Sequence, residues 1–128
     1  MATAITATSI SKDTATADLI ISGGTAWTEA TEAEIEYPRE GKLLIVLQNT
    51  DSTTATATVA AGGYLAAGKG SLDVSLPQND VIYLLLSSDR FKAQGAGTQA
   101  TAADGKITIT FASAGTGAGF IRALSLPY

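Results

Sequence analysis

Two uninterrupted aliphatic stretches dominate the pattern of hydrophobic and polar positions along the chain. Residues 42–49 read KLLIVLQN, with no polar residue between Leu43 and Leu47, and residues 81–86 read VIYLLL. Such runs leave no face for water, so we expect both faces of each segment to be covered. Gly41 precedes the first run and the turn-forming Asn49-Thr50-Asp51-Ser52 follows it, which limits the run to strand length. We therefore predict a buried central strand at 42–49, with 81–86 as its partner in the core.

Alternating segments predict further strands. Residues 71–76 and 106–111 place aliphatic side chains on one face only, and residues 32–36 place Glu32, Glu34 and Glu36 on one face, which we interpret as a solvated outer face. The turn at 49–52 predicts that 53–60 forms a hairpin with the central strand. Residues 17–22 and 119–126 are also predicted strands, 77–80 a turn, and 104–105 a hairpin turn.

No segment has apolar residues at helical spacing over three turns. Eight or nine short strands predict an all-β fold, a two-sheet antiparallel β-sandwich that is jelly-roll-like. The 128 residues fit one domain, 1–128. Residues 1–17 carry Ile5 and Ile10 as their large apolar side chains and are either an edge strand or an N-terminal arm ordered by a neighbour.

Composition indicates a thin core. The hydrophobic fraction is 45%, but 23 of the residues counted are Ala, and only 16% of the chain is charged, against about 25% in ordinary soluble domains. Small neutral side chains suit flat packing against other subunits, and they equally suit an exposed, Thr-rich sheet. A chain of this kind gains stability when it buries more surface in an assembly.

Charge argues against several classes of partner. The net charge is −4 and the Lys and Arg residues are scattered singly, whereas binding to nucleic acid or to a membrane surface requires clustered positive charge. No stretch approaches the roughly 20 apolar residues of a membrane-spanning helix, and no secretory signal is present at the N-terminus. We expect a soluble protein made in a cytoplasm, with no nucleic-acid and no membrane partner.

Catalytic chemistry has little support. The chain contains no His and no Cys, so the common nucleophile–base dyads and zinc ligands are missing. Residues 63–70 resemble a phosphate-binding loop, but Gly70 stands where Ser or Thr is required and a strand follows in place of a helix. Residues 95–100 fit a dinucleotide-binding fingerprint by letter, without the strand–helix context. We expect no enzymatic activity, no cofactor and no metal.

Carbohydrate-binding sandwiches display exposed aromatic side chains, and three aromatic residues could serve in this way: Trp27, Tyr37 and Tyr64. Packing in a core or an interface is the role that we favour for each. Together with Ile5 and Ile10 they form the candidate interaction surface that the sequence suggests.

Four segments resemble a family of bacteriophage and prophage head decoration proteins, also called capsid cement proteins. These segments are ATAITATSISKDTATADL, KLLIVLQNTDST, GSLDVSLPQNDVIYLLLSSDRF and KITITFASAGTGAGFIRALSLP. The resemblance lies in pattern and composition over nearly the whole chain, and no single motif carries it.

The resemblance implies a virion structural protein, a β-sandwich that binds the outer surface of a phage head and stabilises it by clamping neighbouring major capsid subunits. It also implies a homo-oligomer, a trimer, and an N-terminal arm that reaches a neighbour. The partner would be the major capsid protein, and the location would be the outer capsid surface of the virion. The alternative is a phage tail or fibre component with a glycan-binding surface around Trp27, Tyr37 and Tyr64.

Overall fold

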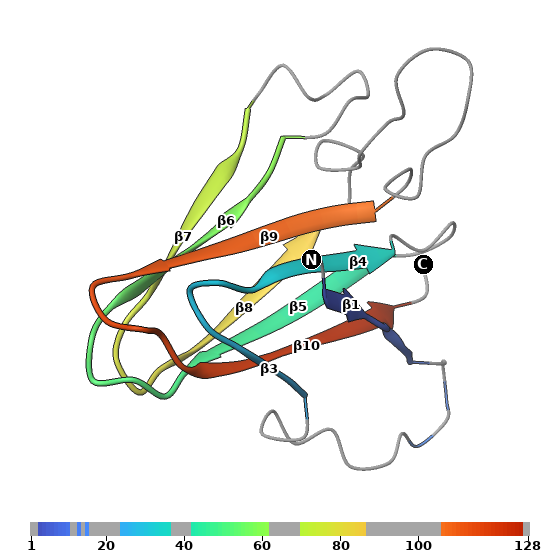
Figure 1. Cartoon of the computed structure of the whole chain (residues 1–128). Coiled ribbons are helices and arrows are strands. Elements are labelled where there is room, and N and C mark those ends of the chain that lie inside the picture. Colours follow the sequence, from blue (N-terminus) through green and yellow to red (C-terminus); the bar gives the residue numbers. More distant parts are fainter. Residues whose placement is uncertain are drawn as a thin grey trace.

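The computed structural model describes residues 3–10, 13, 15, 24–36, 42–61, 70–86 and 106–126. These residues form an all-β structure of two five-stranded sheets, with no helix among them (Figure 1). The strands are β1 (Thr3–Ile5), β2 (Thr8–Ser9), β3 (Thr25–Trp27), β4 (Glu32–Glu36), β5 (Lys42–Asn49), β6 (Ala55–Val59), β7 (Leu72–Leu76), β8 (Val81–Leu86), β9 (Lys106–Ser113) and β10 (Gly119–Leu126).

Sheet A has the strand order β1-β4-β9-β6-β7, and sheet B has the order β2-β10-β5-β8, with β3 also paired to β10. Both sheets are mixed, because β1 runs parallel to β4 and β2 runs parallel to β10. The all-β, two-sheet prediction agrees with this arrangement, which is consistent with a β-sandwich. The prediction that every pairing is antiparallel is wrong, and both exceptions come from the short N-terminal strands.

The core lies between the two sheets and is built from the alternating positions that the sequence pattern identifies. Along β9, Ile107, Ile109 and Phe111 are buried, and along β7 the same face carries Leu72, Val74 and the buried Leu76. Sheet B contributes Leu43, Ile45, Leu47, Ile121 and Ala123 to the same core.

Strand β5 forms at the predicted bounds and lies inside sheet B, between β10 and β8. Its predicted hairpin with 53–60 is wrong, because β6 belongs to sheet A and pairs with β7 and β9. Both edges of β5 are occupied by the ladders to β10 and β8. The turn after Asn49 therefore carries the chain from one sheet to the other.

Asn49 fixes that crossing. It is completely buried, and its amide Nδ2 donates to the carbonyl oxygens of Thr53 (2.8 Å) and Leu76 (2.9 Å). Its Oδ1 accepts from the backbone N–H of Asp51 (3.0 Å), as in an Asx turn. One side chain thus links the end of β5 in sheet B, the turn itself and the end of β7 in sheet A.

The N-terminal segment closes one side of the molecule. β1 lies at the edge of sheet A, and β2 joins sheet B beside β10. Beyond β2, the N–H of Ile10 donates to the carbonyl oxygen of Ser125 (2.8 Å). Within the described part of residues 1–17, β1 is an edge strand of sheet A and β2 an edge strand of sheet B.

Several sequence predictions lie outside the described residues. They are the strand at 17–22, the hairpin turn at 104–105, and the two glycine-rich segments at 63–70 and 95–100, of which only Gly70 is described.

Candidate interaction surface

The outer face of sheet A is polar. The outward residues of its strands include Glu32, Glu34 and Glu36 of β4, and Ala33 and Ile35 between them are buried, as the alternation predicts. The remaining outward positions are largely Thr, Ser and Asp: Thr56, Thr58, Asp73, Ser75, Lys106, Thr108, Thr110 and Ala112. Lys106 Nζ lies 3.6 Å from Glu34 Oε2, and both side chains are partly exposed. These polar and charged side chains are typical of a sheet face that contacts water.

The outer face of sheet B has a different composition. Its outward positions follow from the register of β5 with β8 and β10, since directly opposed residues share a face. We call the following set the outer face of sheet B: Lys42, Leu44, Val46, Gln48, Val81, Tyr83, Leu85, Phe120, Arg122, Leu124 and Leu126.

Three cross-strand rows organise this face. The first joins Leu85, Leu44 and Leu124, the second joins Tyr83, Val46 and Arg122, and the third joins Val81, Gln48 and Phe120. Apolar side chains therefore run across three adjacent strands without an intervening acidic residue.

Two of the three rows end on exposed side chains at β8. Tyr83 is 68% exposed and Leu85 is 52% exposed, the two large hydrophobic residues that lie most open in the described part of the chain. Val46, in the centre, is only 7% exposed, whereas Leu44 and Leu124 are half-buried. A contiguous apolar patch on a small protein commonly marks an interaction site.

The expectation that both faces of 42–49 and 81–86 are covered is thus only half met. The inner face of β5 is fully buried in the core, but the outer face of sheet B retains exposed aliphatic and aromatic surface. The physical reason is the architecture: each sheet of a two-layer structure has one inner face, so a strand that is apolar on both faces has one face left to cover.

The two outer faces also differ in charge. The charged residues on the outer face of sheet B are Lys42 and Arg122, both basic. The outer face of sheet A carries Asp73 and the three Glu residues of β4 against Lys106. A partner that covers the outer face of sheet B would be complementary if it presented apolar groups bordered by acidic ones.

The sequence-based surface residues do not lie on this face. Ile5 is 5% exposed and Trp27 is 1% exposed, and both belong to the hydrophobic core, so their place in the candidate interaction surface is corrected. Ile10 is half-buried beside β10. Tyr37 and Tyr64 lie outside the described residues.

Trp27 is held in the core by two contacts. Its ring stacks on that of Phe111, with centroids 4.4 Å apart and an angle of 5° between the planes. Its Nε1 donates to the carbonyl oxygen of Gln48 (2.9 Å). The indole reaches this oxygen because Gly119, on the intervening strand, has no side chain: a Cβ there would overlap the Gln48 oxygen and lie 2.6 Å from Trp27 Nε1. Packing in the core, one of the two roles favoured from the sequence, is therefore the one this residue has.

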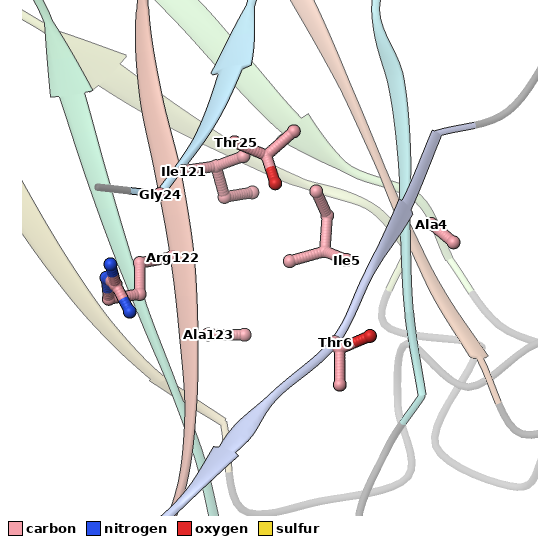
Figure 2. A pocket seen from close by; sticks show the side chains of 8 residues that line it. All are labelled: Ala4, Ile5, Thr6, Gly24, Thr25, Ile121, Arg122 and Ala123. Carbon is pink, nitrogen blue, oxygen red and sulfur yellow. The ribbon is translucent and has the colours of Figure 1, made fainter. Parts of the chain in front are cut away.

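A cavity of about 280 Å³ lies between β10 and residues 4–6 of the N-terminal segment (Figure 2). Its lining comes from three parts of the chain: Ala4, Ile5 and Thr6 of the N-terminal segment, Gly24 and Thr25 where β3 begins, and Ile121, Arg122 and Ala123 of β10. The Arg122 side chain points away from the other labelled side chains, toward the outer face of sheet B. The other lining residues are uncharged, so they offer no group suited to acid–base chemistry.

Within the described ranges, no group of three or more His, Cys, Asp or Glu side chains is placed to hold a metal ion. No helix in those ranges is long and apolar enough to cross a membrane.

Sequence reasoning missed Tyr83 and Leu85 as surface residues because it assigned the whole of 81–86 to the core. The number of apolar residues in the two runs could have indicated that some of them point outward. A strand that alternates needs about half its residues to be apolar in order to fill one inner face, whereas 81–86 is apolar throughout. The surplus residues are those that point outward.

Comparison of the chain with protein-family models, with curated proteins and with solved structures finds no significant match.

Proposed function

We propose that this chain is a virion structural protein, a capsid decoration or cement protein that binds the outer surface of a phage head and clamps neighbouring major capsid subunits. The observation that carries the proposal is the outer face of sheet B, an apolar surface without a cover among the described residues, opposite a polar outer face on sheet A. A protein that binds by one face and meets water by the other needs this asymmetry.

The strand order supports a jelly-roll form of the β-sandwich. If β3 to β10 are taken as the eight strands, the orders β3-β10-β5-β8 and β4-β9-β6-β7 are those of two interleaved Greek keys. Viral capsid domains and lectins both use this architecture, so the fold alone does not choose between them. The choice rests on the surface.

The glycan-binding alternative is less well supported. It placed Trp27, with Tyr37 and Tyr64, on a glycan-binding surface, whereas Trp27 is buried in the core and its Nε1 donates to the Gln48 carbonyl oxygen. A surface of Leu, Val, Phe and Tyr with few hydrogen-bonding groups suits a protein partner better than a polyhydroxylated one.

The expected contribution of the surface can be worked from exposure. Complete burial of a large apolar side chain stabilises by about 1.5–3 kcal/mol. Because Tyr83 and Leu85 are somewhat more than half exposed in the free protein, covering them contributes about 1–2 kcal/mol each. Replacing Leu85 with Lys at the interface should therefore weaken binding at least about tenfold.

The experiment is co-sedimentation of the purified protein with undecorated capsids of the phage that encodes it, together with the melting temperature of those capsids. We expect the wild-type protein to sediment with capsids and to raise their melting temperature. The variant Leu85→Lys should do both more weakly, while its own unfolding is nearly unchanged because Leu85 is exposed.

The matched control is Thr110→Lys, which adds the same charge at an exposed position on the outer face of sheet A. It should bind like the wild-type protein. Equal loss in both variants would indicate a general charge effect, and the absence of any complex with capsids would refute the proposal.

A further inference from the structure

The edge of β8 that no described strand covers is the feature that the proposed function does not use. β8 is the last strand of sheet B and pairs with β5 on one side, and no described strand pairs with its other side. The turn formed by residues 77–80 joins it to β7, the last strand of sheet A, so both sheets end together here. At the opposite side, β1 and β2 of the N-terminal segment pair with both sheets.

Unpaired strand edges promote association, and proteins usually protect them by short length, charge or proline. The other sheet edges follow this rule: β1, β2 and β3 have two or three residues each, and β7 carries the exposed Asp73. β8 is six residues long and contains neither a charge nor a proline. It is the exception among the described edges.

The hydrogen-bond pattern identifies which backbone groups point outward. The N–H of Asn49 donates to the carbonyl oxygen of Asp80 (3.0 Å), at the end of the β5–β8 ladder. In an antiparallel pair, the backbone N–H and C=O groups of successive residues point alternately toward the partner strand and away from it. The backbone groups of Ile82, Leu84 and Leu86 therefore point to β5. Those of Val81, Tyr83 and Leu85 point away from it. The N–H of Val81 is already bonded to the Asp80 side chain (2.9 Å). The backbone N–H and C=O groups of Tyr83 and Leu85 are therefore the ones that a second strand could bond at this edge.

We propose that β8 pairs antiparallel with β8 of a second copy of this chain, so that sheet B continues across a two-fold axis. In the register that leaves Val81 bonded to Asp80, Tyr83 lies opposite Leu85 of the second copy and exchanges two backbone hydrogen bonds with it. The symmetric pair does the same, and Leu84 lies opposite its own copy on the axis. Tyr83 and Leu85 then pack against each other on the outer face.

Charge favours a second copy as the occupant. Self-pairing of β8 brings no like charges together, because the strand is uncharged, whereas self-pairing of β7 would place its Asp73 carboxylates close to each other. The two-fold contact is isologous and closes at two chains, so it gives a dimer and not a filament. It also joins two outer faces of sheet B into one continuous apolar surface.

The area available sets the strength of the pair. The exposed parts of Tyr83 and Leu85, with the partly buried Ile82 and Leu84 behind them, amount to roughly a few hundred Å² per copy. Twice this area is below the about 1,200 Å² at which standard specific interfaces begin, so the pair belongs with the weak, transient interfaces. We therefore expect association only at high protein concentration. The inference does not rest on the proposed function, because it concerns the free protein.

The test is sedimentation velocity of the free protein from about 1 µM to 1 mM, with two variants at one position. Leu85→Pro removes the outward N–H and leaves the β5 ladder intact, as edge strands allow. Leu85→Ala removes the same side chain but keeps the N–H. We expect a wild-type mass of twice 13.0 kDa at high concentration, at least about thirtyfold weaker association for Leu85→Pro, and a smaller loss for Leu85→Ala. Trp27 fluorescence checks that both variants fold.

Single cysteines test the register, since the natural chain has none. Opposed residues at a non-hydrogen-bonded position have Cα atoms about 4.5 Å apart, within disulfide reach. Leu84→Cys should therefore form a disulfide-linked dimer on oxidation. Tyr83→Cys should not, because its own copy lies on a diagonal, more than about 7 Å away.

A wild-type protein that stays monomeric to 1 mM, a mass of three chains, or full association by Leu85→Pro would overturn the proposal, and preferential oxidation of Tyr83→Cys would overturn its register. If the free protein is monomeric and Leu85→Pro alone loses capsid binding, the edge pairs with a capsid strand and not with a second copy.

Discussion

The buried amide of Asn49 gives the sharpest prediction about stability. Replacing it with Ala removes three hydrogen bonds at the point where the chain passes from sheet B to sheet A: those to the carbonyl oxygens of Leu76 and Thr53, and that from the N–H of Asp51.

The magnitude follows from how deeply each partner is buried. The bond to Leu76 is fully buried, and leaving that carbonyl oxygen without a donor costs about 1–3 kcal/mol. The bonds to Thr53 and Asp51 are partly buried, so water can replace them, and each loss costs about 0.5–1 kcal/mol. The sum is about 3 kcal/mol, a large part of the 5–15 kcal/mol that stabilises a typical domain. For a chain of this size it lowers the Tm by roughly 9–15 °C.

Gln48, the preceding residue, is the matched control. It has the same amide group on the same strand but points to the outer face of sheet B, where its Oε1 is buried without a hydrogen-bond partner. Gln48→Ala should therefore change the free energy of unfolding by less than about 0.5 kcal/mol. Asn49→Asp should be at least as destabilising as Asn49→Ala, because it sets a carboxylate oxygen against the Leu76 and Thr53 carbonyl oxygens.

The assay is urea unfolding followed by fluorescence of Trp27, the single tryptophan of the chain. Its burial and its stack on Phe111 are lost on unfolding, so its emission reports the transition. Equal stabilities for Asn49→Ala and Gln48→Ala would refute the reasoning that this amide ties the two sheets together.

Three further predictions concern the interior and the outer face of sheet A. Gly119→Ala should destabilise by about 2–4 kcal/mol in urea unfolding, because its Cβ overlaps the Gln48 carbonyl oxygen and the Trp27 ring, whereas Gly115→Ala, whose Cβ would lie 3.5 Å from Asp51 Oδ2, should be nearly neutral. Similar costs at both glycines would contradict the close packing described at β10. Trp27→Phe should cost about 2 kcal/mol through loss of the bond to Gln48 and of ring volume, as measured by circular dichroism; an unchanged midpoint would show that the bond contributes nothing. Lys106→Ala should change stability by less than about 0.5 kcal/mol, because its ion pair with Glu34 is partly exposed to water. A loss above 1 kcal/mol would mean that this pair belongs to a larger network.

The strands themselves were largely predictable, because alternation is a local property of the chain. Residues 71–76 and 106–111 were placed to within two residues of β7 and β9, with the correct faces inward. The aliphatic run at 42–49 forms a strand with the predicted bounds. Side-chain period and turn residues determine these elements without reference to the rest of the molecule.

Sheet membership was not predictable from local pattern. The turn after Asn49 has the composition of a hairpin turn, but it crosses between the sheets, because β6 pairs with β7 and β9 and the Asn49 side chain bonds to Leu76 of β7. The short strands β1 and β2 contain too few apolar residues to produce a periodic signal, and they form by pairing with β4 and β10.

The candidate surface escaped prediction for a related reason. Exposure depends on how many layers the fold has, and the sequence pattern does not state that number. In a three-layer structure 81–86 would be buried on both faces. In this two-layer one, Tyr83 and Leu85 point outward. Trp27 stood between packing and surface exposure in the sequence, because burial of its polar Nε1 depends on the carbonyl oxygen of Gln48 on another strand.

The central claim is that the outer face of sheet B is the surface that contacts the capsid. Carbene footprinting of the protein, free and bound to capsids, tests it most directly. We predict that labelling falls on binding at Tyr83, Leu85 and Phe120 and is unchanged at Thr58 and Thr110 of sheet A. Protection of the sheet A residues, with the sheet B residues still labelled, would contradict the claim.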